Sequence, residues 1–141
     1  MKYIKLYEQA EPEHRVIRRP DGSVESEQWW LDDTRHREDG PAWIGYRKDG
    51  SVVLEAWYLD GNVHREDGPA QIGYRKDGSV SEEWWKLNGR RHREDGPALI
   101  RYNPDGSIKS EEWWLDEVRI AEITNQGEFE AWKYLKSVGL I

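Results

Sequence analysis

The string His-Arg-Glu-Asp-Gly-Pro-Ala occurs three times in this chain at a spacing of 28 residues. The copies occupy residues 36–42, 64–70 and 92–98. The match extends further, because residues 36–52 and 64–80 are identical except that Trp43 is replaced by Gln71. A period of this length is typical of repeat proteins, in which each unit buries its apolar face by stacking on its neighbours. The sequence therefore predicts a linear array of similar units.

The repeat divides the chain into an array with a cap at each end. The array is expected over residues 14–120, with an N-terminal strand or cap at residues 1–13 and a helical cap at residues 121–141. Within the array, a degenerate unit that lacks the His-Arg-Glu-Asp start precedes three full units; the four units are residues 14–35, 36–63, 64–91 and 92–119.

Each unit carries the pattern of a β-hairpin. In the second full unit, residues 70–75 alternate small or apolar side chains with polar ones, which is typical of a half-buried strand. The pair Asp77-Gly78 then predicts a tight turn, and residues 80–87 form the returning strand. An Asp-Gly pair stands at this point in all four units. We therefore predict a mainly β fold, an elongated antiparallel array of β-hairpins.

Positions 28 residues apart show which side chains the units share. Two positions of the second strand are the same in every unit, and because they are two residues apart they lie on one face. They hold Trp29, Trp57, Trp85 and Trp113, and Leu31, Leu59, Leu87 and Leu115. We expect this face to form the core with the first-strand residues Ala42, Ala70 and Ala98, Ile44, Ile72 and Ile100, and Tyr46, Tyr74 and Tyr102. The intervening positions vary and are expected to face solvent or a target.

A glutamate is repeated on the same predicted face. It occupies positions 27, 55, 83 and 111, and a carboxylate on a packed face is costly unless it is paired. Arg47 and Arg75, or the loop residues Arg37, Arg65 and Arg93, are the expected partners. A structural ladder of ion pairs is favoured over a catalytic row of carboxylates.

The C-terminal segment changes from the β pattern to a helical one. Over residues 128–138, Phe129, Trp132, Leu135 and Val138 recur at intervals of three. Terminal units of an array need a cap, and an open sheet edge would invite pairing with other chains. We therefore predict one amphipathic helix that covers the last hairpin.

The repeated His-Arg-Glu-Asp resembles a catalytic or metal-binding cluster, but its spacing argues against both. Equivalent residues two strands apart would be about 10 Å from each other, whereas zinc holds its nitrogen ligands at about 2 Å. Enzymes also converge different residues on one pocket and do not repeat one set three times. We expect the histidine to pack on a tryptophan or hydrogen-bond the loop, and the arginine to pair with a carboxylate. No catalytic residue, metal or cofactor is predicted.

Composition excludes several classes of function. The net charge of −7 argues against a protein that grips nucleic-acid phosphates, which requires a basic face. The absence of cysteine excludes disulfides and thiolate catalysis and fits a reducing compartment. No apolar segment suggests a signal peptide or a membrane span. The expected location is the cytoplasm, which would be the host cytoplasm for a phage-encoded protein.

The repeated string followed by an Ile/Tyr strand, an Asp-Gly turn and a Trp-bearing strand resembles the variant MORN repeats of bacteriophage, giant-virus and bacterial proteins. The resemblance covers about residues 14–120. It implies an elongated, curved sheet of β-hairpins, a role in protein or membrane interaction, and no cofactor. The chain departs from the standard MORN pattern in having few glycines outside its turns. This departure and the acidic charge argue against lipid binding.

The predicted function is binding of a protein partner, with a phage-type inhibitor of a bacterial defence or host enzyme as the specific hypothesis. Tryptophan and tyrosine are enriched at the cores of interfaces. The candidate binding residues are the aromatic side chains at non-repeated positions, Trp30, Trp43, Tyr58, Trp84 and Trp114. The alternatives are a protein that sequesters a small ligand or nucleotide and a generic MORN-like scaffold. The sequence leaves oligomerisation open.

Overall fold

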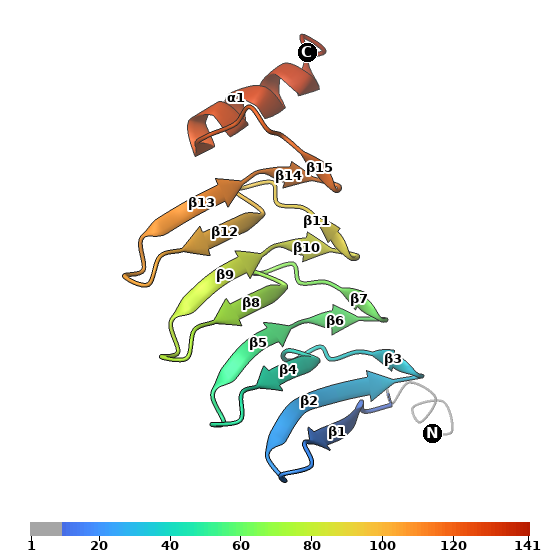
Figure 1. Cartoon of the computed structure of the whole chain (residues 1–141). Coiled ribbons are helices and arrows are strands. Elements are labelled where there is room, and N and C mark those ends of the chain that lie inside the picture. Colours follow the sequence, from blue (N-terminus) through green and yellow to red (C-terminus); the bar gives the residue numbers. More distant parts are fainter. Residues whose placement is uncertain (1–9) are drawn as a thin grey trace, which may run out of the picture.

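The computed structural model describes residues 10–141, which form an open antiparallel array of β-hairpins ending in one helix (Figure 1). The predicted fold class is confirmed. Successive long strands pair in one sheet in the order β1-β2-β4-β5-β8-β9-β12-β13. These strands are β1 (Glu13–Arg18), β2 (Val24–Leu31), β4 (Trp43–Tyr46), β5 (Val52–Ala56), β8 (Gln71–Tyr74), β9 (Val80–Trp84), β12 (Leu99–Tyr102) and β13 (Ile108–Glu112).

Each full unit also contains a second, shorter hairpin that the sequence analysis missed. The returning strand is interrupted at Trp57, Trp85 and Trp113, and a two-residue strand follows each interruption. Asp60 and Gly61 have φ values of 49° and 80°, the left-handed pair that a tight hairpin turn requires. The short strands are β6 (Tyr58–Leu59) with β7 (Asn62–Val63), β10 (Lys86–Leu87) with β11 (Arg90–Arg91), and β14 (Trp114–Leu115) with β15 (Val118–Arg119).

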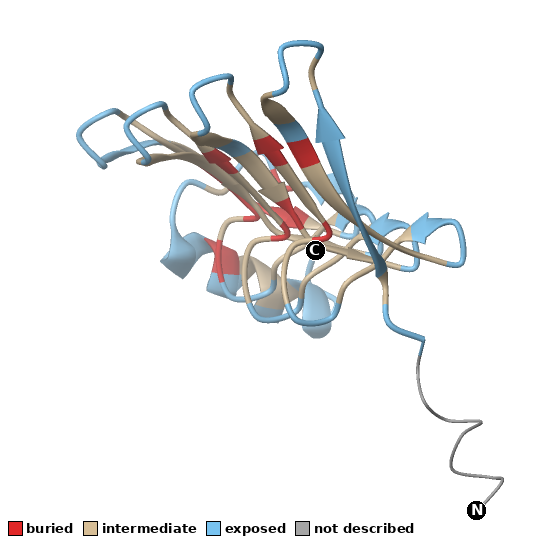
Figure 2. Ribbon diagram, turned by 90° about the horizontal axis from the view of Figure 1, so that it is seen from below, coloured by how far each residue is buried: buried red, intermediate tan, exposed pale blue. Residues whose placement is uncertain are grey.

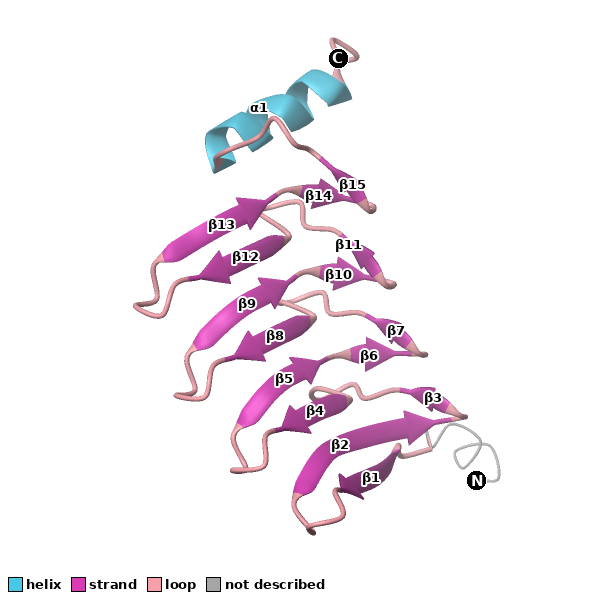
Figure 3. Ribbon diagram, viewed as in Figure 1, coloured by secondary structure: helices cyan, strands magenta, loops and turns pink. Residues whose placement is uncertain are grey.

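The degenerate first unit differs from the full units in its returning strand. Its β2 runs on without interruption and pairs with β3 (Thr34–Arg35). In every full unit, the long and short hairpins point in different directions when the array is viewed end-on (Figure 2). The His-Arg-Glu-Asp loops connect each short hairpin to the next long hairpin (Figure 3).

The strand register defines two faces of the long sheet. Ile44 pairs with Glu55 and Glu27, so the repeated side chains share one face, here called the constant face. Trp43 pairs with Ala56 and Gln28 on the opposite face, here called the variable face. The predicted separation of repeated from non-repeated positions is therefore present in the sheet.

The buried core is smaller than the sequence analysis predicted. The repeated alanines are fully buried, as expected, but of the repeated tryptophans only Trp113 is buried and the other three are half-buried. A single sheet has no second layer to cover these rings, and only the last unit is covered by the helix. Apart from glycines, the buried residues are Ser26, Ala42, Ala56, Ala70, Ala98, Leu99, Ile100, Trp113, Trp114, Ile120 and Phe129.

The helix α1 (Gln126–Ser137) covers the end of the array, close to the span predicted for it. The Asn125 side chain caps the helix by accepting a hydrogen bond from the backbone N–H of Glu128. Phe129 is completely buried and packs with Trp113 and Ile120. Ile120 occupies the position of the repeated histidine. The last unit has therefore replaced its polar loop with an apolar contact to the helix.

Candidate functional site

The arginine of each repeated loop is held by three contacts. Its guanidinium lies over the tryptophan ring of the preceding returning strand, pairs with the aspartate two residues later, and donates to the proline carbonyl. For Arg65, these contacts are 4.2 Å to the centre of the Trp57 ring, 3.0 Å to Asp67 and 3.2 Å to the Pro69 carbonyl oxygen. Arg37 and Arg93 repeat the arrangement. The predicted arginine–carboxylate pairing is confirmed, and it closes the loop.

The histidine of each repeated loop ties one unit to the next. The Nδ1 atoms of His36, His64 and His92 accept hydrogen bonds from backbone N–H groups in the following short hairpin, at 3.1, 2.9 and 3.0 Å. The histidines thus form a hydrogen bond, as one of the two predicted roles required, but with the next unit and not with their own loop. Within residues 10–141, no group of three or more His, Asp or Glu side chains is arranged to hold a metal ion.

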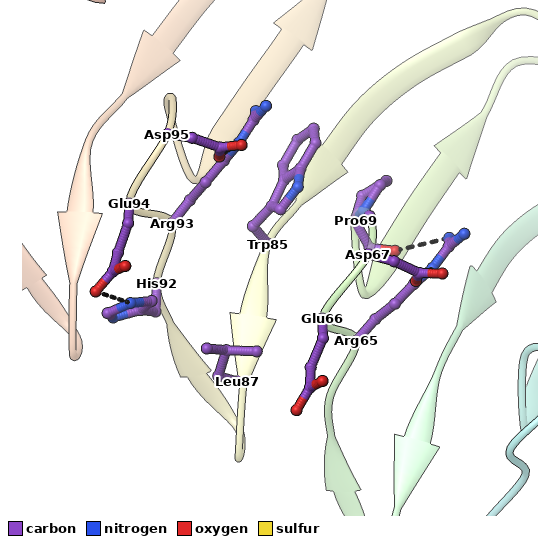
Figure 4. Close-up of a pocket in the computed structure, with 11 residues that line it drawn as sticks. Arg65, Glu66, Asp67, Pro69, Trp85, Leu87, His92, Arg93, Glu94 and Asp95 are labelled. Carbon is purple, nitrogen blue, oxygen red and sulfur yellow. Dashed lines mark hydrogen bonds and ion pairs between the residues drawn. The ribbon is translucent and has the colours of Figure 1, made fainter.

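An open groove separates each loop from the next. The groove between the second and third loops has a volume of about 720 Å³, and Trp85 and Leu87 form its floor (Figure 4). An equivalent groove of about 680 Å³ lies between the first and second loops. The carboxylates of Glu66 and Glu94 stand at the rim with 84% and 78% of their side chains exposed. The grooves thus have an apolar floor and a charged rim of carboxylates and arginines, and no Ser, Thr, Cys or Lys among the described residues lines either of them.

Three of the four repeated glutamates pair with tyrosine hydroxyls and not with arginines, which corrects the prediction. Tyr46 donates to Glu27 at 2.6 Å, and Tyr74 donates to Glu55 at 2.7 Å. The expected partner Arg47 instead donates to backbone carbonyls. The tyrosine of the next unit lies on the same face as the glutamate, so its hydroxyl meets the carboxylate first. The same pairing joins Tyr102 to Glu83.

Burial and these contacts shift the pKa values of the tyrosines and of Glu27. The hydrogen bond from Tyr46 lowers the pKa of Glu27. Burial raises the pKa of Tyr46 to about 12, and the hydrogen bond to the Glu27 carboxylate acts in the same direction. Burial and the Glu83 carboxylate likewise raise the pKa of Tyr102 to about 12. The tyrosines are therefore held in their protonated, donating form.

We expect the protein to lose stability in alkaline solution because of these tyrosines. Their raised pKa contributes stability that is present below the ordinary tyrosine pKa of 10.0 and is lost as the pH rises towards about 12. Urea unfolding between these pH values should show a falling midpoint. In the double variant Tyr46→Phe/Tyr102→Phe, the midpoint should fall less steeply with pH than in the wild type. The control Tyr134→Phe, at an exposed position, should show the same fall as the wild type. An unchanged pH slope in the double variant would contradict the role assigned to the pairs.

The five candidate binding residues lie on the variable face or on the short hairpins that continue it. The Trp30 indole N–H donates to Gln28 at 3.0 Å, which places its ring on the same face as Trp43. Trp43 lies across Gly45, where an added Cβ would approach the ring to 2.3 Å. Tyr58 and Trp84 are half-buried, whereas Trp114 is only 9% exposed. Four of the five rings are therefore accessible, and Trp114 contributes chiefly to packing.

Cations lie over these rings, which the sequence analysis did not predict. Five cations approach ring centres on this side of the array at 3.6–5.8 Å. They are Arg15, Arg35, Lys86, Arg91 and Arg101. Desolvation by burial lowers the pKa of Lys86. The 28-residue comparison could have found Arg35 and Arg91, because they occupy equivalent positions beside the aromatic position.

The variable face also carries a shallow groove where the long and short hairpins meet. Its volume is about 290 Å³, and its lining comes from both kinds of hairpin. The lining residues are Arg35, Trp43, Leu54, Ala56, Tyr58 and Gln71. Because Trp43 has no tryptophan equivalent in the other units, this groove is specific to one place in the array.

No helix among the described residues is long and apolar enough to cross a membrane. Comparison of the chain with models of protein families, with characterised proteins and with solved structures found no match. The resemblance to variant MORN repeats is therefore carried by the repeat sequence alone.

Proposed function

We propose that this chain is a non-catalytic repeat protein that binds a protein partner through its variable face. The supporting observation is that accessible aromatic rings gather on the face where the repeat does not require them. At the position of Trp84 the other units have glutamine, alanine and glutamate, and at the position of Trp43 they have Gln71 and Leu99. Folding of a unit therefore does not demand these rings, whereas interface cores favour them.

The contacts of the loop residues also favour binding over catalysis. The repeated His, Arg and Asp side chains are engaged in bonds that close loops or join units. The groove of about 290 Å³ on the variable face is at the lower limit for a small-molecule site, which ordinarily measures about 300–1,000 Å³ and is mostly apolar. The grooves of about 720 and 680 Å³ between the loops are large enough, but most of the side chains that line them are charged. A protein surface fits the broad and shallow variable face better than a small ligand or nucleotide does. We therefore favour binding of a protein partner over sequestration of a small ligand or nucleotide and over a generic scaffold role.

The specific hypothesis is that the partner is a bacterial protein. Its support is the resemblance to repeats found in bacteriophage and bacterial proteins. We propose a phage-type inhibitor that acts in the bacterial cytoplasm by covering the surface of a defence or host enzyme.

Affinity capture from a bacterial lysate tests this proposal. The wild-type chain should retain one or more bacterial proteins, whereas Trp43→Ala and Tyr58→Ala should weaken capture, since truncating an interface ring can cost about 2 kcal/mol or more. Tyr134→Ala, at a 65% exposed position on α1, is the matched control and should capture normally. Circular dichroism should confirm that all variants are folded. Capture that survives both substitutions would place the binding surface elsewhere.

A further inference from the structure

Two arginines at equivalent positions of the array both lie over aromatic rings. Arg35 and Arg91 are the same repeat position two units apart. The Arg91 guanidinium lies 3.6 Å from the centre of the Trp114 ring. The Arg35 guanidinium lies between two rings, 5.2 Å from the centre of Trp30 and 5.6 Å from that of Tyr58. In both units the array presents a cation stacked on aromatic rings.

Arg91 has a carboxylate partner in the turn of the next unit. Glu117 accepts hydrogen bonds from the Arg91 backbone N–H and from Nε, both at 2.7 Å, and from a terminal guanidinium nitrogen. The same turn is fixed by a backbone hydrogen bond of 2.9 Å from the N–H of Glu117 to the carbonyl of Arg91. The repeat thus contains a complete site in which one carboxylate satisfies a stacked arginine.

Arg35 has the same backbone neighbour in the next unit but no carboxylate. The residue equivalent to Glu117 is Gly61, and its N–H donates to the Arg35 carbonyl at the same distance of 2.9 Å. The backbone is therefore unchanged, and only the side chain is missing. Among residues 10–141, the Arg35 Nε is buried and has no hydrogen-bond partner. A buried donor without a partner is costly, so an incoming acceptor would be favoured here.

The position of Arg35 connects this donor to the variable face. Arg35 lines the groove described above together with Trp43, Leu54 and Tyr58. We propose that this groove, the Arg35 groove, binds an acidic side chain of the protein partner, whose carboxylate takes the place that Glu117 takes at Arg91. An apolar side chain beside the acidic one would lie against Trp43 and Leu54. This inference rests on the proposed function and specifies the chemistry of the partner.

Two peptides that differ only in the carboxylate test the proposal. The probes are acetyl-Phe-Glu-Leu-amide and acetyl-Phe-Gln-Leu-amide, titrated into the full chain and followed by NMR. The Glu peptide should shift the Arg35 Nε–H and Trp43 indole N–H signals, and it should bind at least about tenfold more tightly than the Gln peptide, because hydrogen bonds to charged groups are the stronger ones. Equal binding of the two peptides, or no shift at Arg35 up to the solubility limit, would overturn the proposal.

A change at Gly61 supplies the second arm of the test. Gly61→Glu would place a carboxylate where the repeat has Glu117, and should therefore occupy Arg35 and abolish binding of the Glu peptide. Gly61 has a φ of +80° and Glu117 a φ of 66°, so both positions use the left-handed region. Gly61→Ala is the control, because it imposes the same strain on the backbone but adds no carboxylate. Its new Cβ would approach Thr34 to 3.3 Å, and the variant should still bind the Glu peptide. Loss of binding in both variants would contradict the proposal.

Lysate capture with the same variants separates this inference from the proposed function. If capture depends on Trp43 but is unaffected by Arg35→Met and Gly61→Glu, the partner uses the variable face without an acidic contact, and only the inference is wrong. If capture is unaffected by Trp43→Ala as well, the proposed function is wrong too. Weakening by Arg35→Met and Gly61→Glu but not by Gly61→Ala is the expected result.

Discussion

Alanine in place of Phe129 is expected to reduce the free energy of unfolding by about 3–5 kcal/mol, the usual cost of truncating a fully buried phenylalanine. Phe129 has no exposed surface, and it is the residue through which α1 packs on Trp113 and Ile120. Its loss would leave a cavity and weaken the packing of α1 over the last hairpin. Urea unfolding followed by circular dichroism would measure the change.

The control for this prediction lies on the same helix. Tyr134 is 65% exposed, so Tyr134→Ala should alter stability by less than about 1 kcal/mol while making the same gain in helix propensity. A loss at Phe129 no larger than the loss at Tyr134 would mean that α1 is an appendage and not the cover of the array. Aggregation of Phe129→Ala alone would fit exposure of an open sheet end.

The repeat made much of the fold predictable because every unit must stack on similar neighbours. The 28-residue period and the Asp-Gly pairs predicted the long hairpins and their turns, and the change of period after residue 123 predicted the helix. The short hairpins were missed because their strands are only two residues long, as at Tyr58–Leu59. Such strands are too short to show an alternating pattern.

The site was predictable where contacts are local in sequence. Arg65 pairs with Asp67 two residues away, and this pairing was expected from the loop itself. The partner of Glu55 was assigned wrongly because Tyr74 is 19 residues away and meets it only through the stacking of units. The stacking of Arg65 on Trp57 also depends on how the loop folds back over the strand. Periodicity identifies which positions are equivalent, but it does not identify which positions touch.

Comparison between units offers a way to separate folding from binding. A contact repeated along the array, such as the arginine over Trp29, Trp57 and Trp85, is needed wherever one unit stacks on the next. A side chain present in one unit only, such as Trp43 or Trp84, is not needed for stacking and is available for recognition. Arg35 and Arg91 show how such a comparison works. The Arg91 Nε donates to Glu117, whereas the buried Arg35 Nε has no hydrogen-bond partner among the described residues.

Adjacent tryptophans on opposite faces provide the sharpest test of this separation. Trp85→Ala is expected to cost about 2–3 kcal/mol, somewhat below the range for a fully buried tryptophan, because Trp85 is half-buried and Arg93 stacks on it at 4.0 Å. Trp84→Ala should cost less than about 1 kcal/mol, as for a surface substitution, since Ala56 already occupies the equivalent position in the neighbouring unit. Urea unfolding of the two variants would measure both costs. The two substitutions are identical and lie at neighbouring positions, so their costs can be compared directly. A larger loss of stability at Trp84 would show that the variable face, and not the constant face, holds the units together. The proposed binding surface would then have to be moved to the repeated loops.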